Sequence, residues 1–102
     1  METKTATQMA NLYGLKSSIA FNKLMVRCGI LKDTVKGYVL ADSLHGRGLI
    51  AVIDAHYFLP NGFRATKKRA AWTESGQHFI RQHLGRIGIV PVNEQQDLFN
   101  AN

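Results

Sequence analysis

Hydrophobic side chains recur at helical spacing in the segment that follows Lys16. Phe21, Leu24, Met25 and Cys28 fall at positions i, i+3, i+4 and i+7, which together form one face of an α-helix. This spacing predicts a helix from residue 17 or 18 to residue 28. Gly29 follows it, as expected of a residue that ends a helix.

A shorter helix is predicted just before it, from residue 5 or 6 to Tyr13. Thr5 and Gln8 have the spacing of a capping box. The small Ala10 would let the second helix cross the first closely, and Gly14 would supply the left-handed backbone of a tight turn. The two segments therefore predict a helix-turn-helix.

The middle of the chain has the composition of β-strands. Val35–Ala41 and Ile50–Phe58 are rich in β-branched and aromatic residues, with turn chemistry between them at His45–Gly48. Pro60–Gly62 is a strong turn signal, so the segment Phe63–Trp72 that follows is expected on a hairpin arm.

A closing helix is predicted from the N-cap residue Thr73 to about Leu84, with Gly85 ending it. The expected fold is α+β: a winged helix-turn-helix over residues 1–92, with two N-terminal helices, a small antiparallel hairpin or sheet and the closing helix. Ile87–Pro91 could add a strand to a partner or cover the domain's own core. Asn93–Asn102 reads as a polar, frayed tail.

The charge balance favours an acidic partner. Thirteen Lys and Arg residues oppose seven Asp and Glu residues, giving a formal charge of +6. A single cysteine cannot form an internal disulfide, the N-terminus has no apolar leader, and the apolar runs are too short to span a bilayer. We expect a cytoplasmic protein with no membrane association.

Two groups of residues are candidates for contact with double-stranded DNA. On the second helix, Asn22 could pair with adenine and its basic neighbours with guanine or phosphate; the candidates are Lys16, Ser17, Ser18, Asn22, Lys23 and Arg27. The alternative is a solvated face on which Asn22 braces the fold. On the arm, phosphate contact is expected from Arg64, Lys67, Lys68 and Arg69, a run that could otherwise be a solubilising loop.

Catalysis, metal binding and cofactor binding find little support. His78 and His83 are five residues apart, whereas a helical zinc pair is spaced i, i+4. Cys28 lies on the apolar stripe of its helix and reads as a small core residue. Trp72 and Phe79 could stack on nucleic-acid bases, but their positions around a helix start favour a place in the core. We expect no enzyme, no metal and no cofactor.

Three segments carry a family resemblance: Thr7–Ala10 with Leu12–Leu15, Phe21–Met25 with Gly29–Leu31, and, most specifically, Trp72–Ile80. They resemble the KilAC domain, the C-terminal domain of many phage antirepressor proteins. Family members usually carry this domain behind a separate N-terminal module, so this chain is expected to be a stand-alone version. Between Gly14 and the helix at Phe21, the chain has one residue more than the family pattern, and this extra residue lies within Lys16–Ser18.

The resemblance implies regulation of phage or mobile-element genes, by one of two routes. In the first, the protein binds duplex DNA with the second helix and a basic wing. In the second, it is an antirepressor-type interaction protein that binds a repressor or host regulatory protein without touching DNA. Ile19 and Val26, which interrupt the basic face of the second helix, would then be the partner-binding residues. Homodimerisation stays open.

Overall fold

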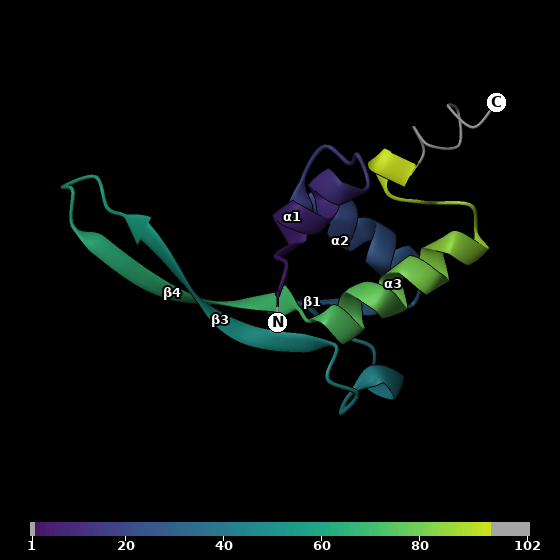
Figure 1. Cartoon of the computed structure of the whole chain (residues 1–102). Coiled ribbons are helices and arrows are strands. Elements are labelled where there is room, and N and C mark those ends of the chain that lie inside the picture. The colour runs from purple at the N-terminus through teal and green to yellow at the C-terminus, as the bar shows by residue number, and fades with distance from the viewer. Residues whose placement is uncertain (1, 95–102) are drawn as a thin grey trace.

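The computed structural model describes residues 2–94 and consists of a helical body from which a long two-stranded arm projects (Figure 1). The body contains α1 (Ala6–Leu12), α2 (Ser18–Arg27), α3 (Glu74–Arg86) and a short hairpin of β1 (Leu31–Thr34) and β2 (Gly37–Leu40). A 3₁₀ turn, η1 (Asp42–Leu44), leads to the arm, which is β3 (Ile50–Phe58) paired with β4 (Arg64–Trp72). The radius of gyration is 15.3 Å, against about 13 Å for a compact chain of this length, because the arm extends beyond the body.

The predicted turn between α1 and α2 is confirmed. Thr5 and Gln8 form the capping box in both directions at the start of α1. At its end Gly14 has a φ of 70°, and the Leu15 amide donates to the Ala10 carbonyl over 2.8 Å. A Cβ on Gly14 would lie 2.8 Å from Val92 Cγ2, so both the backbone conformation and the packing require glycine here.

The apolar stripe predicted for α2 is also confirmed. Phe21 and Met25 are fully buried, and Leu24 and Cys28 pack against the core from partly exposed positions. The helix ends as α1 does, with Gly29 at a φ of 77° and the Ile30 amide donating to the Met25 carbonyl over 2.9 Å.

The sheet arrangement differs from the expectation. Two separate two-stranded antiparallel sheets form, β1–β2 and β3–β4, whereas we expected the segment at 35–41 to adjoin Ile50–Phe58 across the turn at His45–Gly48. The first strand was missed because only Leu31 of β1 is buried, while Lys32, Asp33 and Thr34 are exposed. The molecule is therefore mixed α+β, with helices and two small sheets.

The arm matches the prediction closely. Its register runs from the pair Ile50–Trp72 at the body to the pair Phe58–Arg64 near the tip. At the tip the Leu59 amide donates to the Phe63 carbonyl over 2.8 Å and the Gly62 amide to the Leu59 carbonyl over 2.9 Å. The predicted turn at Pro60–Gly62 therefore closes the hairpin.

The start of α3 is as predicted and its end is not. The Thr73 hydroxyl accepts from the Gly76 amide over 3.0 Å, which is the expected N-cap. The helix passes through Gly85 and continues to Arg86. It stops where Gly88 takes a φ of 85° and the Ile89 amide donates to the Leu84 carbonyl over 2.9 Å.

The core lies between the three helices and the base of the arm. Trp72, 4% exposed, packs its ring edge-on against Phe21 with centroids 6.2 Å apart, and Phe79 is partly buried on the same core, as predicted. Beyond α3, Ile89 packs on this core and Pro91 is buried, which favours the second reading of the segment at 87–91. Of the expected polar tail, residues 93 and 94 belong to a helical turn that begins at residue 92; residues 95–102 lie outside the described part of the chain.

Candidate nucleic-acid interface

The basic run lies on the arm, where both faces are open to solvent. Residues paired across the two strands share a face, so the register divides the four cations between the faces. One face carries Lys68 opposite Asp54 and Arg64 opposite Phe58. The other carries Lys67 opposite Ala55 and Arg69 opposite Ile53. All four basic residues are exposed. The arm therefore presents positive charge on both sides.

The two faces differ in how freely their cations can bind a partner. Lys68 Nζ lies 3.1 Å from Asp54 Oδ1, and the Arg64 guanidinium lies over the Phe58 ring, 5.9 Å from its centroid. Within residues 2–94, neither Lys67 nor Arg69 has an ion pair or a side-chain hydrogen bond. The other side chains on their face are small or uncharged. The ammonium group of Lys67 and the guanidinium group of Arg69 are therefore free to contact an anion.

Helix α2 presents a second, smaller basic group. Lys16 precedes the helix and Lys23 and Arg27 lie on it, and all three side chains are exposed. Ser17 is the N-cap, and its hydroxyl accepts from the Ala20 amide over 3.2 Å, so this oxygen already has a structural role. Ser18 is half-buried in the first turn. The two exposed cations on α2 itself, Lys23 and Arg27, lie about one turn apart.

The two apolar candidates on α2 have different environments. Ile19 is 59% exposed, as expected of a residue on the open face. Val26 is half-buried and packs against the core, so its expected place on the exposed face is wrong. The reason is that α2 is covered on more than one side, by α1 and by β1. Only Ile19 is left as an accessible apolar residue among the cations.

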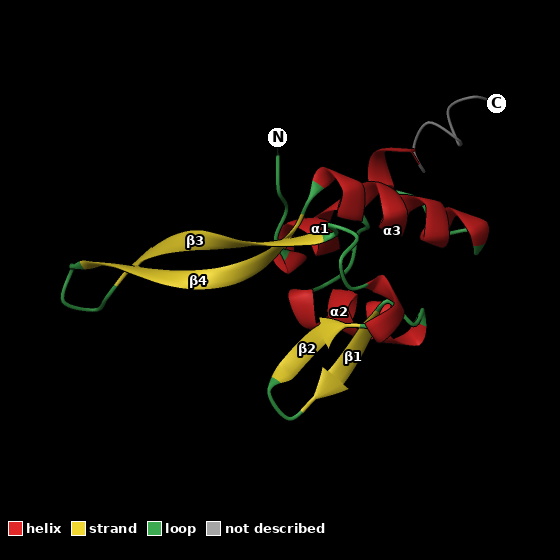
Figure 2. Ribbon diagram, turned by 90° about the horizontal axis from the view of Figure 1, so that it is seen from below, coloured by secondary structure: helices red, strands yellow, loops and turns green. Residues whose placement is uncertain are grey.

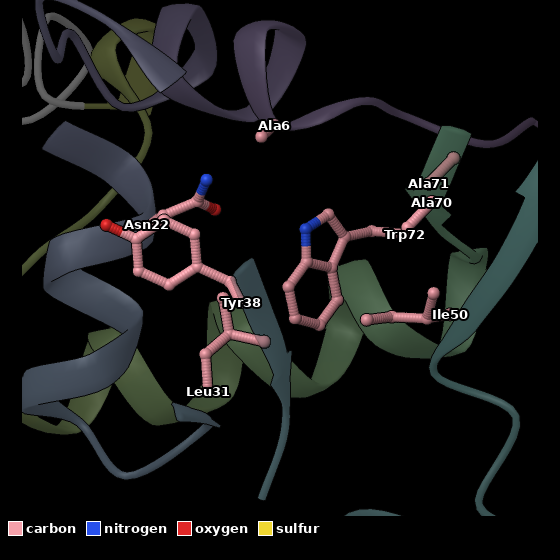
Figure 3. A pocket seen from close by; sticks show the side chains of 8 residues that line it. All are labelled: Ala6, Asn22, Leu31, Tyr38, Ile50, Ala70, Ala71 and Trp72. Carbon is pink, nitrogen blue, oxygen red and sulfur yellow. The ribbon is translucent and has the colours of Figure 1, made fainter. Parts of the chain in front are cut away.

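Asn22 lines a recess at the base of the arm (Figure 3), and none of those cations is among the residues of its walls. The recess has a volume of about 230 Å³ and is open to solvent. Its walls come from both helices of the turn, the short hairpin and the arm; they are Ala6, Asn22, Leu31, Tyr38, Ile50, Ala70, Ala71 and Trp72. In Figure 3 the Trp72 indole nitrogen faces the Asn22 amide across this space. The structure thus separates Asn22 from Lys23 and Arg27.

The β1–β2 hairpin follows α2 directly (Figure 2). Its second strand lies within the segment Val35–Ala41 that was predicted as a strand, whereas β1 and its pairing with β2 were missed by sequence reasoning. The hairpin adds two lysines to the surface. Lys32 Nζ lies 2.8 Å from Asp42 Oδ1, and this hydrogen bond and charge lower the pKa of the Asp42 carboxyl. Lys36 lies in the turn, which the Thr34 hydroxyl ties together by donating to the Gly37 carbonyl over 2.7 Å. The sequence signal that could have revealed this turn is Gly37, whose φ is 112°.

The residues considered for catalysis or metal binding are dispersed. Burial raises the pKa of the Cys28 thiol, which disfavours the reactive thiolate. His56 Nδ1 lies 3.3 Å from the Thr66 hydroxyl, and Asp54 pairs with Lys68. No three His, Cys, Asp or Glu side chains among residues 2–94 are arranged to hold a metal ion. In the same part of the chain, no helix has the length and apolar character needed to cross a membrane.

Comparison with known proteins identifies a family. Residues 2–86 match the model of the phage antirepressor protein KilAC domain. This range includes both helices of the turn, both hairpins and the whole of α3. No curated protein and no solved structure matches the chain.

Proposed function

Because the chain belongs to the phage antirepressor KilAC domain family, we propose that it regulates phage or mobile-element genes by binding double-stranded DNA. In this proposal α1 and α2 act as a helix-turn-helix, and the domain works as a winged variant of that motif. Helix α2 enters the major groove and the basic arm follows the phosphate backbone.

The observation that carries the proposal is the free positive charge on the arm. The two strands carry four exposed cations and a single carboxylate. Of these cations, Lys67 and Arg69 have no ion-pair partner in the described part of the chain. Such an arrangement is unfavourable by itself, because neighbouring like charges repel. A polyanion relieves this repulsion and releases its own counterions on binding. Duplex DNA fits this requirement along an arm of this length.

The face of α2 supports the same partner. Lys23 and Arg27 are exposed four residues apart, so they lie on one side of the helix and can reach guanine or phosphate together. Lys16 and the amides at the helix start can contact the backbone at the edge of the groove, with Ser17 and Ser18 beside them. Asn22, half-buried in the recess, contributes to base contact only if DNA reaches the base of the arm.

A second candidate function is an antirepressor that binds a protein partner. The observation that favours it is Ile19, whose side chain is 59% exposed near the start of α2, between Lys16 and Lys23 in the sequence. An exposed apolar side chain suits the apolar core of a protein interface and is unusual among phosphate-binding cations. In this case a repressor or host regulatory protein, rather than DNA, would cover α2. Homodimerisation is compatible with either function.

The proposal is tested by fluorescence anisotropy of the full chain with a labelled random-sequence duplex, titrated across salt. We expect a high association constant at low salt. Its logarithm should fall linearly with the logarithm of the salt concentration. The variant K67A/K68A/R69A should flatten this slope by up to about 2.7, which is about 0.9 for each lost phosphate contact. The triple variant K4A/K32A/K36A removes the same charge from the body and is the matched control. An unchanged slope in the arm variant would reject phosphate contact by the arm.

A further inference from the structure

The tip of the arm is apolar, although both of its strands are basic. Phe58 and Phe63 are 71% and 70% exposed, and Leu59 is 38% exposed. Pro60 lies between them in the turn and is also exposed. Figure 1 shows this turn at the end of the arm farthest from the helices. These side chains therefore contribute nothing to the core, and their exposure needs another explanation.

The turn holds the two phenylalanines in an ordered frame. Two backbone hydrogen bonds close it, between Leu59 and Phe63 and between Gly62 and Leu59. The Phe63 amide also donates to Asn61 Oδ1 over 3.1 Å. On the strand side, the Arg64 guanidinium lies over the Phe58 ring. The backbone of the turn consequently has little conformational freedom to lose on binding, and the Arg64 contact restricts the Phe58 ring.

Charge decides which partner suits this tip. A second copy of the chain would bring another cationic arm against this one, and the like charges would repel. A polyanion is attracted instead, and the cations adjoining the rings would lie on its phosphates. In duplex DNA, apolar side chains such as Phe, Leu and Pro act as wedges that enter base steps from the minor groove and kink the helix.

We propose that the tip of the arm forms such a wedge, with Phe58 on one face of the hairpin and Phe63 on the other. The wedge enters the minor groove and partly unstacks one base step while the strands behind it contact the backbone. This inference rests on the proposed DNA binding. It also predicts that the bound DNA is bent, which phosphate contact alone would not cause. Pyrimidine–purine steps such as TA unstack most easily, so the wedge favours them.

Bending is measured by energy transfer between dyes at the two ends of a 24-base-pair duplex with a central TA step. The wild-type chain should raise the transfer efficiency at saturation, because a kink brings the ends together. In F58S/F63S the increase should be lost, while the salt slope of binding stays that of the wild type. Both residues are exposed, so the variant should fold, which its circular dichroism and melting temperature verify. V35S is the matched control, because Val35 is a fully exposed apolar residue in the turn of the other hairpin.

A second duplex, kinked in advance by two unpaired adenines, separates wedging from simple contact. Wild type should bind it about tenfold tighter than the uniform duplex, because the cost of unstacking is already met. For F58S/F63S the two affinities should differ by less than about threefold. Salt-dependent binding without a change in transfer efficiency would overturn the wedge and leave DNA binding standing. Absence of binding would overturn both. Bending that F58S/F63S retains, or that V35S abolishes, would also reject the wedge.

Discussion

Asp54 and Lys68 lie opposite each other across the arm and form an ion pair, with Asp54 Oδ1 3.1 Å from Lys68 Nζ. One of the four cations on the arm is therefore already paired with a carboxylate. Both side chains are mostly exposed, so the pair contributes less than about 1 kcal/mol to stability. Its larger effect is on the charge that the arm offers to an anion, because Asp54 is the only carboxylate on either strand.

The substitution D54N should therefore strengthen DNA binding. It removes a repulsive charge and frees Lys68, so the salt slope should steepen by up to about one and the affinity at 0.1 M salt should rise about three- to tenfold. Anisotropy with a random-sequence duplex measures both quantities. D33N makes the same change of charge on the exposed short hairpin, away from the arm, and serves as the control. Equal effects of the two substitutions would mean that net charge, and not the arm, governs binding.

Gly76 packs directly against the backbone that enters the arm. A Cβ at this position would lie 2.1 Å from the Leu49 carbonyl oxygen and 3.1 Å from the Trp72 ring. The same carbonyl accepts from the Thr73 amide over 3.0 Å, so it cannot move away without losing that bond. We expect G76A to lower the free energy of unfolding by about 1–3 kcal/mol through overpacking, measured by urea denaturation.

Gly85 offers the matched control within the same helix. A Cβ there meets nothing within 4 Å, and the residue is exposed. G85A should stabilise the protein by about 0.5–1 kcal/mol, because alanine has the higher helix propensity. If G76A were also neutral or stabilising, α3 would not pack on Leu49 as closely as the structure has it.

The helices could be predicted from sequence because their signals are local. Apolar spacing, N-cap residues and the glycines after α1 and α2 act within a few positions of each helix. Gly85 misled the prediction because a glycine on an exposed helix face resembles a C-terminal stop. The actual stop depends on Gly88 and on Ile89, which packs back onto the core. That contact depends on the tertiary fold.

The short hairpin and the recess at Asn22 could not be predicted for a related reason. β1 buries only Leu31, so it has no alternating pattern that would reveal a strand. The recess is formed by residues from 6 to 72, and the orientation of Asn22 toward Trp72 follows from how α2 packs. The arm, by contrast, was predicted because its turn and its basic run are continuous in sequence. The apolar residues of the tip lie in the same segment. Their role as a candidate contact surface could be inferred only from their exposure in the structure.

Lys23 and Ile19 provide a test that distinguishes the two candidate functions of α2. Both side chains are exposed, but a cation serves a DNA contact and an isoleucine serves a protein contact. If α2 reads DNA, K23A should weaken binding to a duplex selected from a random pool by about 1–3 kcal/mol. It should also narrow the difference in affinity between the selected and unselected duplexes, because base contacts supply specificity.

I19S is the counterpart and should leave both affinities within about 0.5 kcal/mol of the wild type, since a surface substitution outside the interface has little effect. Competition anisotropy with both duplexes provides the measurement for each variant. The reverse pattern, with K23A neutral on DNA and I19S abolishing regulation of a phage promoter in cells, would assign α2 to a protein partner. DNA contact by the arm alone would then account for any salt-dependent binding.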